Sequence, residues 1–425
     1  LNAQTNTAGV NTYNTAVGAL AGEKVTIGVQ NTLIGALAGD ALTDSDFNTA
    51  VGHLALSSDT LGSRSTAIGM NTLRDQNFTS ATETYNVAVG HGAGLLVTTG
   101  VQNTLIGGLA GDALTSSVGN VAVGYLSLSA ATTADLNTAV GHRALTTNIL
   151  SDRNVALGYA ALSTHNLSSN ADGYNVGIGY NAGGAVTTGV ENTLIGGLAG
   201  DALTDADYNT AIGSLALTTD TLGSRTVAIG TGALANQNFT SATNSYNTAM
   251  GFSAGNAVTT GVDNTLIGGL AGDAITDADR NVALGYGALG ACQLGSRNTA
   301  VGFLSLDSTN PSSAANTQNT ALGHSAGRHI STGTHNVCIG ADSGLATNLT
   351  TGVGNVVVGN FAHTSAANSE FANGFGYDIN AESGYTTLGK AADDIRAAHG
   401  NVTWATVSDQ RYKKDIVDST AGLSF

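Results

Sequence analysis

The chain has 425 residues, including 58 glycines and one proline, and its formal net charge is −16. This acidic charge disfavours binding to nucleic acid and adsorption to anionic membranes, both of which require basic surfaces. Glycine does not recur at every third residue, which excludes a collagen helix, and no run of 18 apolar residues predicts a membrane-spanning helix. Apolar residues make up 42% of the chain, but only 5% of residues are aromatic, so we expect many thin cores in series.

A repeat of the form Asn-x-x-apolar-Gly begins near the first residue and continues to residue 359. The repeats start at Asn14, Asn31, Asn48, Ser65, Asn86, Asn103, Asn120, Asn137, Asn154, Asn175, Asn192, Asn209, Thr226, Asn247, Asn264, Asn281, Asn298, Asn319, Asn336 and Asn355. Most are 17 residues long, four are 21 and the last step is 19. Numbered from this start as position 0, position 1 is Thr or Val, position 4 is Gly, and position 7 is small. The opening LNAQTNTAGV already has this composition and lacks an initial Met, so we expect a fragment or a processed product.

The repeat predicts a short β-strand, a glycine corner and a second tight segment. A unit of 17 residues is too short for a pair of helices, so the predicted fold is all-β: a parallel β-solenoid, or β-roll, with 17-residue coils. Stacking places Asn above Asn, where the amides can form a hydrogen-bonded ladder. Alternatively, Asn supplies left-handed turn geometry. The sequence favours neither interpretation, and both can hold.

The predicted strand is apolar or small on both faces, as in Asn-Val-Ala-Val-Gly at 120–124. One face can fill the interior of the coil, and the other is too apolar to face water. We therefore expect a homotrimeric fibre, intertwined or side by side, in which this second face is covered. A single thin solenoid is the alternative.

The 21-residue repeats contain polar insertions, as at 75–80 and 236–241. Insertions in a solenoid project as loops, and these loops either contact a partner or act as neutral spacers. Cys292 and Cys338 lie in different repeats without a spacing signature, so we expect two buried small hydrophobic residues.

Other columns of the repeat do not predict a metal, cofactor or catalytic site. An Asp follows Leu-Ala-Gly at Asp40, Asp112, Asp201 and Asp273. One carboxylate in several coils cannot supply the six or more oxygens that calcium prefers, so these residues predict turns or caps. Position 5 holds His91, His142, His324, Tyr125, Tyr159, Tyr180 and Phe252 in different repeats. We expect a surface corner there without a ligand role. Columns of Thr suggest ice binding, but Val interrupts them.

The sequence changes beyond residue 359. Residues 360–404 are predicted to form an aromatic-richer transition region after the shaft of residues 1–359. Within this region, Tyr-Thr-Thr-Leu-Gly at 385–389 is expected to form a last degenerate coil, and 391–396 a helical turn.

The final segment runs Ser-Asp-Gln-Arg-Tyr-Lys-Lys-Asp-Ile over 408–416 and ends with Ala-Gly-Leu-Ser-Phe. It resembles the opening of the intramolecular chaperone domain of phage tail spikes and fibres, the peptidase S74 family. The resemblance implies that residues 405–425 are the truncated start of a domain that trimerises the chain, assists its folding and often cuts itself off. It further implies cleavage between Ser408 and Asp409, with Ser408 as nucleophile and Lys413 as its base. A Ser hydroxyl needs such a base, and a desolvated Lys can serve.

These observations favour a trimeric tail fibre or spike shaft, exposed on a virion outside the host cell. The expected partners are other tail proteins and a host cell-surface glycan or protein, but not nucleic acid. The repeats are also similar to the β-roll heads of trimeric autotransporter adhesins, which have a shorter unit, so a bacterial surface adhesin is the alternative. A glycan depolymerase would need clustered carboxylates, and the repeats have few outside turns. We expect no enzymatic activity in the shaft and no cofactor.

Overall fold

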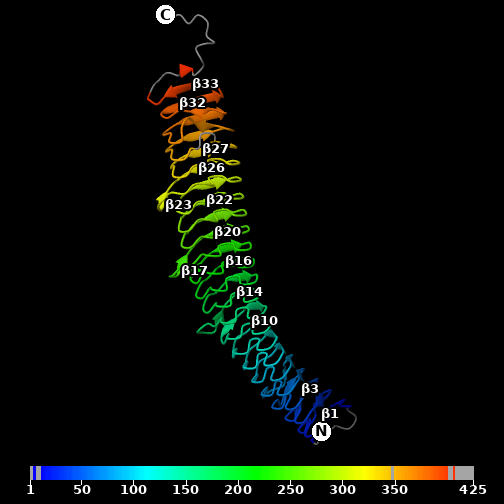
Figure 1. Ribbon diagram of the computed structural model, residues 1–425. Helices are drawn as coiled ribbons and strands as arrows, with labels where there is room; N and C mark the ends of the chain where they lie inside the picture. Colours follow the sequence, from blue (N-terminus) through cyan, green and yellow to red (C-terminus); the bar gives the residue numbers. More distant parts are fainter. Residues whose placement is uncertain (1–2, 6–10, 346–348, 401–404, 407–425) are drawn as a thin grey trace, which may run out of the picture. The chain divides into compact units, whose positions relative to one another are not determined.

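The computed structural model describes residues 3–5, 11–345, 349–400 and 405–406, and it divides into two compact units, residues 1–247 and 248–425. Each unit is a parallel β-solenoid in which one short strand from every coil stacks on the corresponding strand of the next coil (Figure 1). The predicted all-β solenoid with 17-residue coils is therefore confirmed.

The stacked strands of the first unit are three residues long and begin one residue after each repeat start. They are β1 (Thr15–Val17), β2 (Thr32–Ile34), β3 (Thr49–Val51), β5 (Thr66–Ile68), β7 (Val87–Val89), β8 (Thr104–Ile106), β9 (Val121–Val123), β10 (Thr138–Val140), β12 (Val155–Leu157), β14 (Val176–Ile178), β15 (Thr193–Ile195), β16 (Thr210–Ile212) and β18 (Val227–Ile229). Adjacent strands pair in parallel with equivalent positions opposite each other, so that Thr104 faces Val121 and Ile106 faces Val123. The sequence period therefore sets the register directly.

The second unit continues the same pattern. Its stacked strands are β20 (Thr248–Met250), β21 (Thr265–Ile267), β22 (Val282–Leu284), β24 (Thr299–Val301), β26 (Thr320–Leu322), β27 (Val337–Ile339), β28 (Val356–Val358), β30 (Asn373–Tyr377) and β32 (Tyr385–Lys390). Parallel pairing extends beyond residue 359, because β30 pairs with both β28 and β32. The expected degenerate coil at 385–389 is the strand β32.

The helical turn expected at 391–396 is wrong. Ala391 adopts a left-handed φ of 52°, and the chain reverses into β33 (Asp393–Ala398), which pairs antiparallel with β32. The short strand β34 (Ala405–Thr406) then pairs antiparallel with β33. The free edge of β32 offers backbone hydrogen bonds to β33, and these override the weak helix propensity of Ala-Ala-Asp-Asp.

The 21-residue coils form additional two-stranded parallel sheets. These pair β4 (Gly62–Ser63) with β6 (Thr82–Glu83), β11 (Ser151–Asp152) with β13 (Ala171–Asp172), β17 (Gly223–Ser224) with β19 (Thr243–Asn244), and β23 (Gly295–Ser296) with β25 (Ala315–Asn316). A fifth pair, β29 (His363–Thr364) with β31 (Asn380–Ala381), lies near the end of the second unit.

Position 4 requires glycine for two reasons. Gly52 has a φ of 141°, which L-residues rarely adopt, and a Cβ at Gly52 would lie 2.3 Å from the carbonyl oxygen of Gly69 in the next coil. The same close approach recurs along both units, so the corner of every coil stacks backbone on backbone.

Positions 2 and 8 fill the interior in a complementary way. Where position 2 is Ala, as at Ala122, position 8 is usually Leu, as at Leu128; where position 2 is Leu105, position 8 is Gly111. A Cβ on Gly111 would lie 2.8 Å from Cδ2 of Leu105. It would also lie 2.8 Å from Cδ1 of Leu114 at position 11, so the side chains at positions 2 and 11 together leave room only for Gly at position 8 of this coil.

Candidate functional site

The repeat Asn residues form a buried ladder. The side-chain oxygen Oδ1 of Asn103 accepts a hydrogen bond from the backbone N–H of Asn120 at 3.0 Å, and the Nδ2 of Asn120 donates to the carbonyl of Ala134 at 2.8 Å. Asn120 is fully buried, and none of the described repeat Asn residues has a positive φ. The left-handed residue is instead the one before the ladder position, for example Leu136 with φ 58°. The ladder interpretation is confirmed, and the turn interpretation of these Asn residues is wrong.

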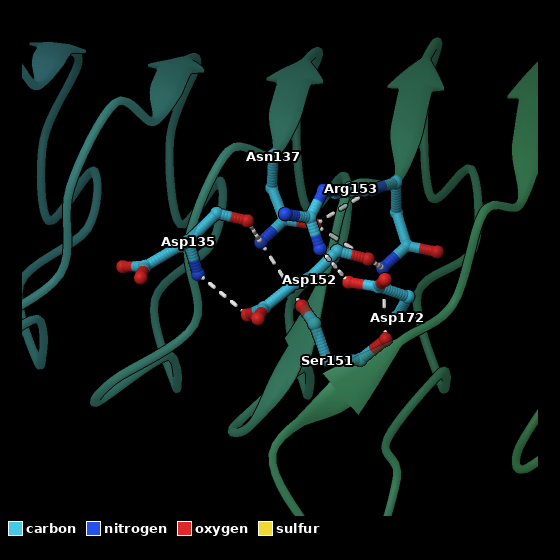
Figure 2. A network of polar contacts seen from close by, with 7 residues as sticks. Asp135, Asn137, Ser151, Asp152, Arg153 and Asp172 are labelled. Carbon is cyan, nitrogen blue, oxygen red and sulfur yellow. Dashed lines mark hydrogen bonds and ion pairs between the residues drawn. The ribbon is translucent and has the colours of Figure 1, made fainter.

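A second ladder runs two residues before the first. The backbone N–H of Asp135 donates to Oδ1 of Asp152 at 2.7 Å, and Asn137 Nδ2 donates to the carbonyls of Asp135 and Ser151 (Figure 2). At the solvent-exposed side of this network, Arg153 forms an ion pair with Asp172. Each coil thus satisfies the turn amides of its neighbour, as buried backbone groups require.

The polar insertion segments help to complete the ladder where Asn is missing. At Ser65, the Nε2 of Gln76 donates to Ser65 Oγ at 2.8 Å and to Asp59 Oδ2 at 2.6 Å, while its Oε1 accepts from Asn86 Nδ2 at 2.8 Å. Gln76 and Asp59 are fully buried. The same arrangement recurs with Asp220, Thr226, Gln237 and Asn247. Gln76 and Gln237 therefore give these segments a structural role, so they are not neutral spacers.

Position 11 shows where polar groups enter the interior. Most described coils have an aliphatic side chain at position 11. In four places along the chain, two consecutive coils have a polar or sulfur-containing side chain there instead. These pairs are Asp59 with Gln76, Asn148 with His165, Asp220 with Gln237, and Cys292 with Thr309. Burial raises the pKa of Asp59 and of Asp220 above the ordinary value of 3.8, and it lowers the pKa of His165 to about 4.

Both cysteines are free and fully buried, as predicted. Burial raises the pKa of the Cys292 thiol to about 11 and that of Cys338 to about 12. These thiols are therefore protonated and unreactive at neutral pH, because the thiolate is the nucleophile.

The outward face of the stacked strands is apolar. In each three-residue strand the middle side chain points inward, and positions 1 and 3 point outward. Ile34, Ile68 and Ile106 are each 39% exposed, and Leu284 and Leu322 of the second unit are exposed to a similar degree. A continuous row of Thr, Val, Ile and Leu side chains therefore covers this face in each unit. We call it the strand face.

Exposed aromatic rings stack at position 5. In the first unit, the ring of His142 lies 5.5 Å from that of Tyr125 and 5.3 Å from that of Tyr159, and Tyr159 lies 5.4 Å from Tyr180. The His142, Tyr159 and Tyr180 planes are nearly parallel, and Tyr159 is 48% exposed. A similar stack in the second unit comprises Tyr286, Phe303 and His324. The sequence placed these residues at a surface corner but did not predict the stacks, because those depend on aromatic residues in consecutive coils.

A hollow of about 220 Å³ lies beside the first stack. It is lined by Arg143, Thr146, Thr147, Tyr159, Ala160, Ser163 and Thr164. Of these residues, only Tyr159 belongs to a column that stands out in the sequence, because the others are common surface residue types without a shared spacing.

Metal and catalytic chemistry have few candidates in the described part of the chain. No group of three or more His, Cys, Asp or Glu side chains there could hold a metal ion. In the Asp column, Asp201 accepts a hydrogen bond from Thr218 at 2.6 Å, and burial raises the pKa of Asp40, Asp112 and Asp273. Ser408 and Lys413 lie outside the described residues, as does most of the region 405–425.

No helix in the described ranges is both long and apolar enough to cross a membrane. No model of a known protein family matches the chain, and comparison with curated proteins finds no match.

Proposed function

We propose that this chain is the shaft of a homotrimeric viral tail fibre or spike, which stands on the virion and attaches it to a host cell. The observation that carries the proposal is the strand face. A row of half-exposed aliphatic side chains that recurs in coil after coil is unusual for a surface in water, and large exposed apolar patches mark interaction sites. The fold itself is consistent with fibre and adhesin proteins.

Cyclic symmetry suits this surface. If the symmetry axis runs along the coil stack, each coil contacts the equivalent coils of the partner chains. The Ile and Val side chains of one chain then pack against the same side chains of the others along the whole stack. Closure around such an axis buries the whole strand face without leaving an open apolar edge. The number three comes from the resemblance of 408–416 to trimerising chaperones.

The same resemblance supplies the folding mechanism. Parallel β-structure with contacts between chains forms slowly and exposes strand edges during folding. A terminal module that aligns three chains would fix their register before the coils stack, after which cleavage between Ser408 and Asp409 would release it. In this proposal the Ser408 hydroxyl attacks the carbonyl carbon of the scissile bond, and Lys413 takes its proton and delivers it to the amino group of Asp409 as that bond breaks. Water then hydrolyses the resulting ester.

Mass spectrometry of the full-length gene product tests both parts. Under denaturing conditions, the wild-type chain is expected to end at Ser408, whereas the Ser408→Ala variant should remain uncut. Under native conditions, both should be trimers, because cleavage follows assembly. An uncut wild-type chain would contradict the cleavage step, and a monomeric wild-type chain would contradict the fibre.

A further inference from the structure

Beside the aromatic stack of the first unit, position 6 lacks the Leu that many other coils have there. Other coils of this unit commonly place Leu there, as at Leu20, Leu37, Leu54, Leu109, Leu126, Leu198 and Leu215. In other coils position 6 is Asn71, Gly92, Asn181 or Gly232, and the two consecutive coils beside the hollow carry Arg143 and Ala160. Both keep the left-handed backbone of the column, with φ values of 59° and 52°, so only the side chains differ. The short Ala160 side chain leaves space in the column, and Arg143 and Ala160 both line the hollow there.

The lining of the hollow combines three kinds of group. Tyr159 contributes an exposed aromatic ring, Arg143 a guanidinium, and Thr146, Thr147, Ser163 and Thr164 contribute hydroxyls. Hydrogen bonds orient the hydroxyls: Thr146 donates to the Arg143 carbonyl at 2.6 Å, and Thr147 donates to the Ser163 carbonyl at 2.9 Å. Each hydroxyl oxygen retains lone pairs that can accept a hydrogen bond from a ligand.

The charge of Arg143 is not neutralised by a neighbour. No ion pair joins it to a carboxylate within the described residues, whereas Arg64, Arg153 and Arg280 each pair with an acidic side chain. Among the described arginines, Arg225 and Arg297 also lack an ion pair, but of these three only Arg143 lines the hollow. A guanidinium binds a carboxylate through two parallel hydrogen bonds, which makes a carboxylate the fitting counter-ion.

We propose that the hollow binds one carboxylated sugar residue of an acidic polysaccharide. His142 and Tyr180 stack on the two faces of the Tyr159 ring, so the sugar ring packs against the exposed edge of Tyr159. The carboxylate of the sugar pairs with Arg143, and its hydroxyls donate to the Thr and Ser oxygens. The volume of about 220 Å³ is below the roughly 300–1,000 Å³ of pockets that enclose drug-sized ligands, so it suits a single ring. The exposed ring edges of Tyr125, His142 and Tyr180 continue this surface along the coils, where neighbouring sugar residues of the same polysaccharide can lie.

This inference rests on the proposed attachment to a host surface and specifies the ligand class. It is tested by calorimetric titration of the full-length protein with oligomers of galacturonate, glucuronate and mannuronate. The same oligomers with their carboxyl groups reduced to alcohols serve as the ligand control. At least one carboxylated series should bind, and its reduced counterpart should bind about tenfold more weakly or not at all.

Two variants restore the common Leu of the column and are therefore expected to fold. Arg143→Leu removes the cation and Ala160→Leu fills the hollow, and each should weaken binding by about tenfold or more. Phe303→Ala, in the second stack, should leave binding unchanged. The proposal is overturned if no carboxylated series binds, or if both Leu variants bind like the wild type.

Native mass spectrometry of the same samples separates this proposal from the fibre. A trimer that binds no carboxylated oligomer would overturn the sugar site alone, whereas a monomer that binds one would overturn the fibre alone. If Arg143→Leu or Ala160→Leu changes the oligomeric state, the hollow is an interface between chains, and the sugar site is overturned.

Discussion

Burial of a single side chain, His165, strongly lowers its pKa. Its Nε2 lies 2.9 Å from Ser151 Oγ, and it occupies the interior position that Gln76 and Gln237 occupy in equivalent coils. Burial holds its pKa at about 4, below the ordinary 6.5. The unfolded chain therefore binds the proton more readily than the folded coil as the pH falls from 6.5 towards 4.

We predict that the coil of His165 is destabilised by acid. Its stability contribution is complete above pH 6.5 and is lost as the pH falls towards 4, by up to about 3 kcal/mol at about 1.4 kcal/mol per pKa unit. His165→Gln should abolish most of this loss, since Gln fits the same position elsewhere. Amide hydrogen exchange of the peptides covering residues 154–175 measures the effect.

The two consecutive coils that contain Asp59 and Gln76 are the internal control for acid sensitivity, because they have no histidine at the equivalent interior position. Burial raises the pKa of Asp59, so the contribution of this carboxyl is complete below pH 3.8 and is lost as the pH rises through the raised value. Peptides that contain Asp59 should therefore become no less protected from hydrogen exchange as the pH falls from 6.5 to about 4, the range in which peptides that contain His165 open. Equal acid sensitivity in wild type and His165→Gln would show that burial of this imidazole is not the cause.

At the scale of the coil, packing is set by pairs of positions rather than by single residues. Leu105 and Gly111 share one space, and the next coil fills the same space with Ala122 and Leu128. Leu128 has a φ of 51°, close to the 56° of Gly111, so Leu is compatible with the backbone at position 8.

A double-mutant cycle in a Leu114→Ala background tests this exchange, because Cδ1 of Leu114 would also lie 2.8 Å from a Cβ at position 111. Leu105→Ala should cost about 2–5 kcal/mol through a cavity, and Gly111→Leu alone should be destabilising through collision with Leu105. In the Leu114→Ala background the double variant has the same side chains as the neighbouring coil at positions 2, 8 and 11, where that coil has Ala122, Leu128 and Ala131, and it should recover most of the loss, measured by urea unfolding. Additive losses would contradict the shared-space account.

The coil was largely predictable because its constraints are local. Gly at position 4 and the apolar residue before it indicate a strand and a corner, and the 17-residue period sets the register. Whether the repeat Asn residues form a ladder or supply turn geometry was not predictable, because it depends on which residue of the coil has the positive φ. The interior role of Gln76 and the stack from Tyr125 to Tyr180 also escaped, since both depend on residues brought together from different coils. The turn at Ala391 was missed because an open strand edge outweighs local propensity.

At the scale of the whole molecule, the strand face is the surface that most needs a partner. Ile68 and Ile106 point outward from β5 and β8 in the first unit, so a charge placed there would not enter the interior of the coil. If three chains meet along this face, two lysines per chain would bring six like charges into an apolar interface, which is strongly unfavourable.

Sedimentation of the Ile68→Lys/Ile106→Lys double variant beside the wild type tests this association most directly. The wild type should sediment as a species three times the 42.2 kDa of one chain, or three times the chain ending at Ser408, whereas the variant should sediment as a folded monomer. Thr79→Lys, at an exposed position of an inserted segment, is the matched control and should remain trimeric. A trimeric double variant, or a monomeric wild type, would contradict the strand face as the interface.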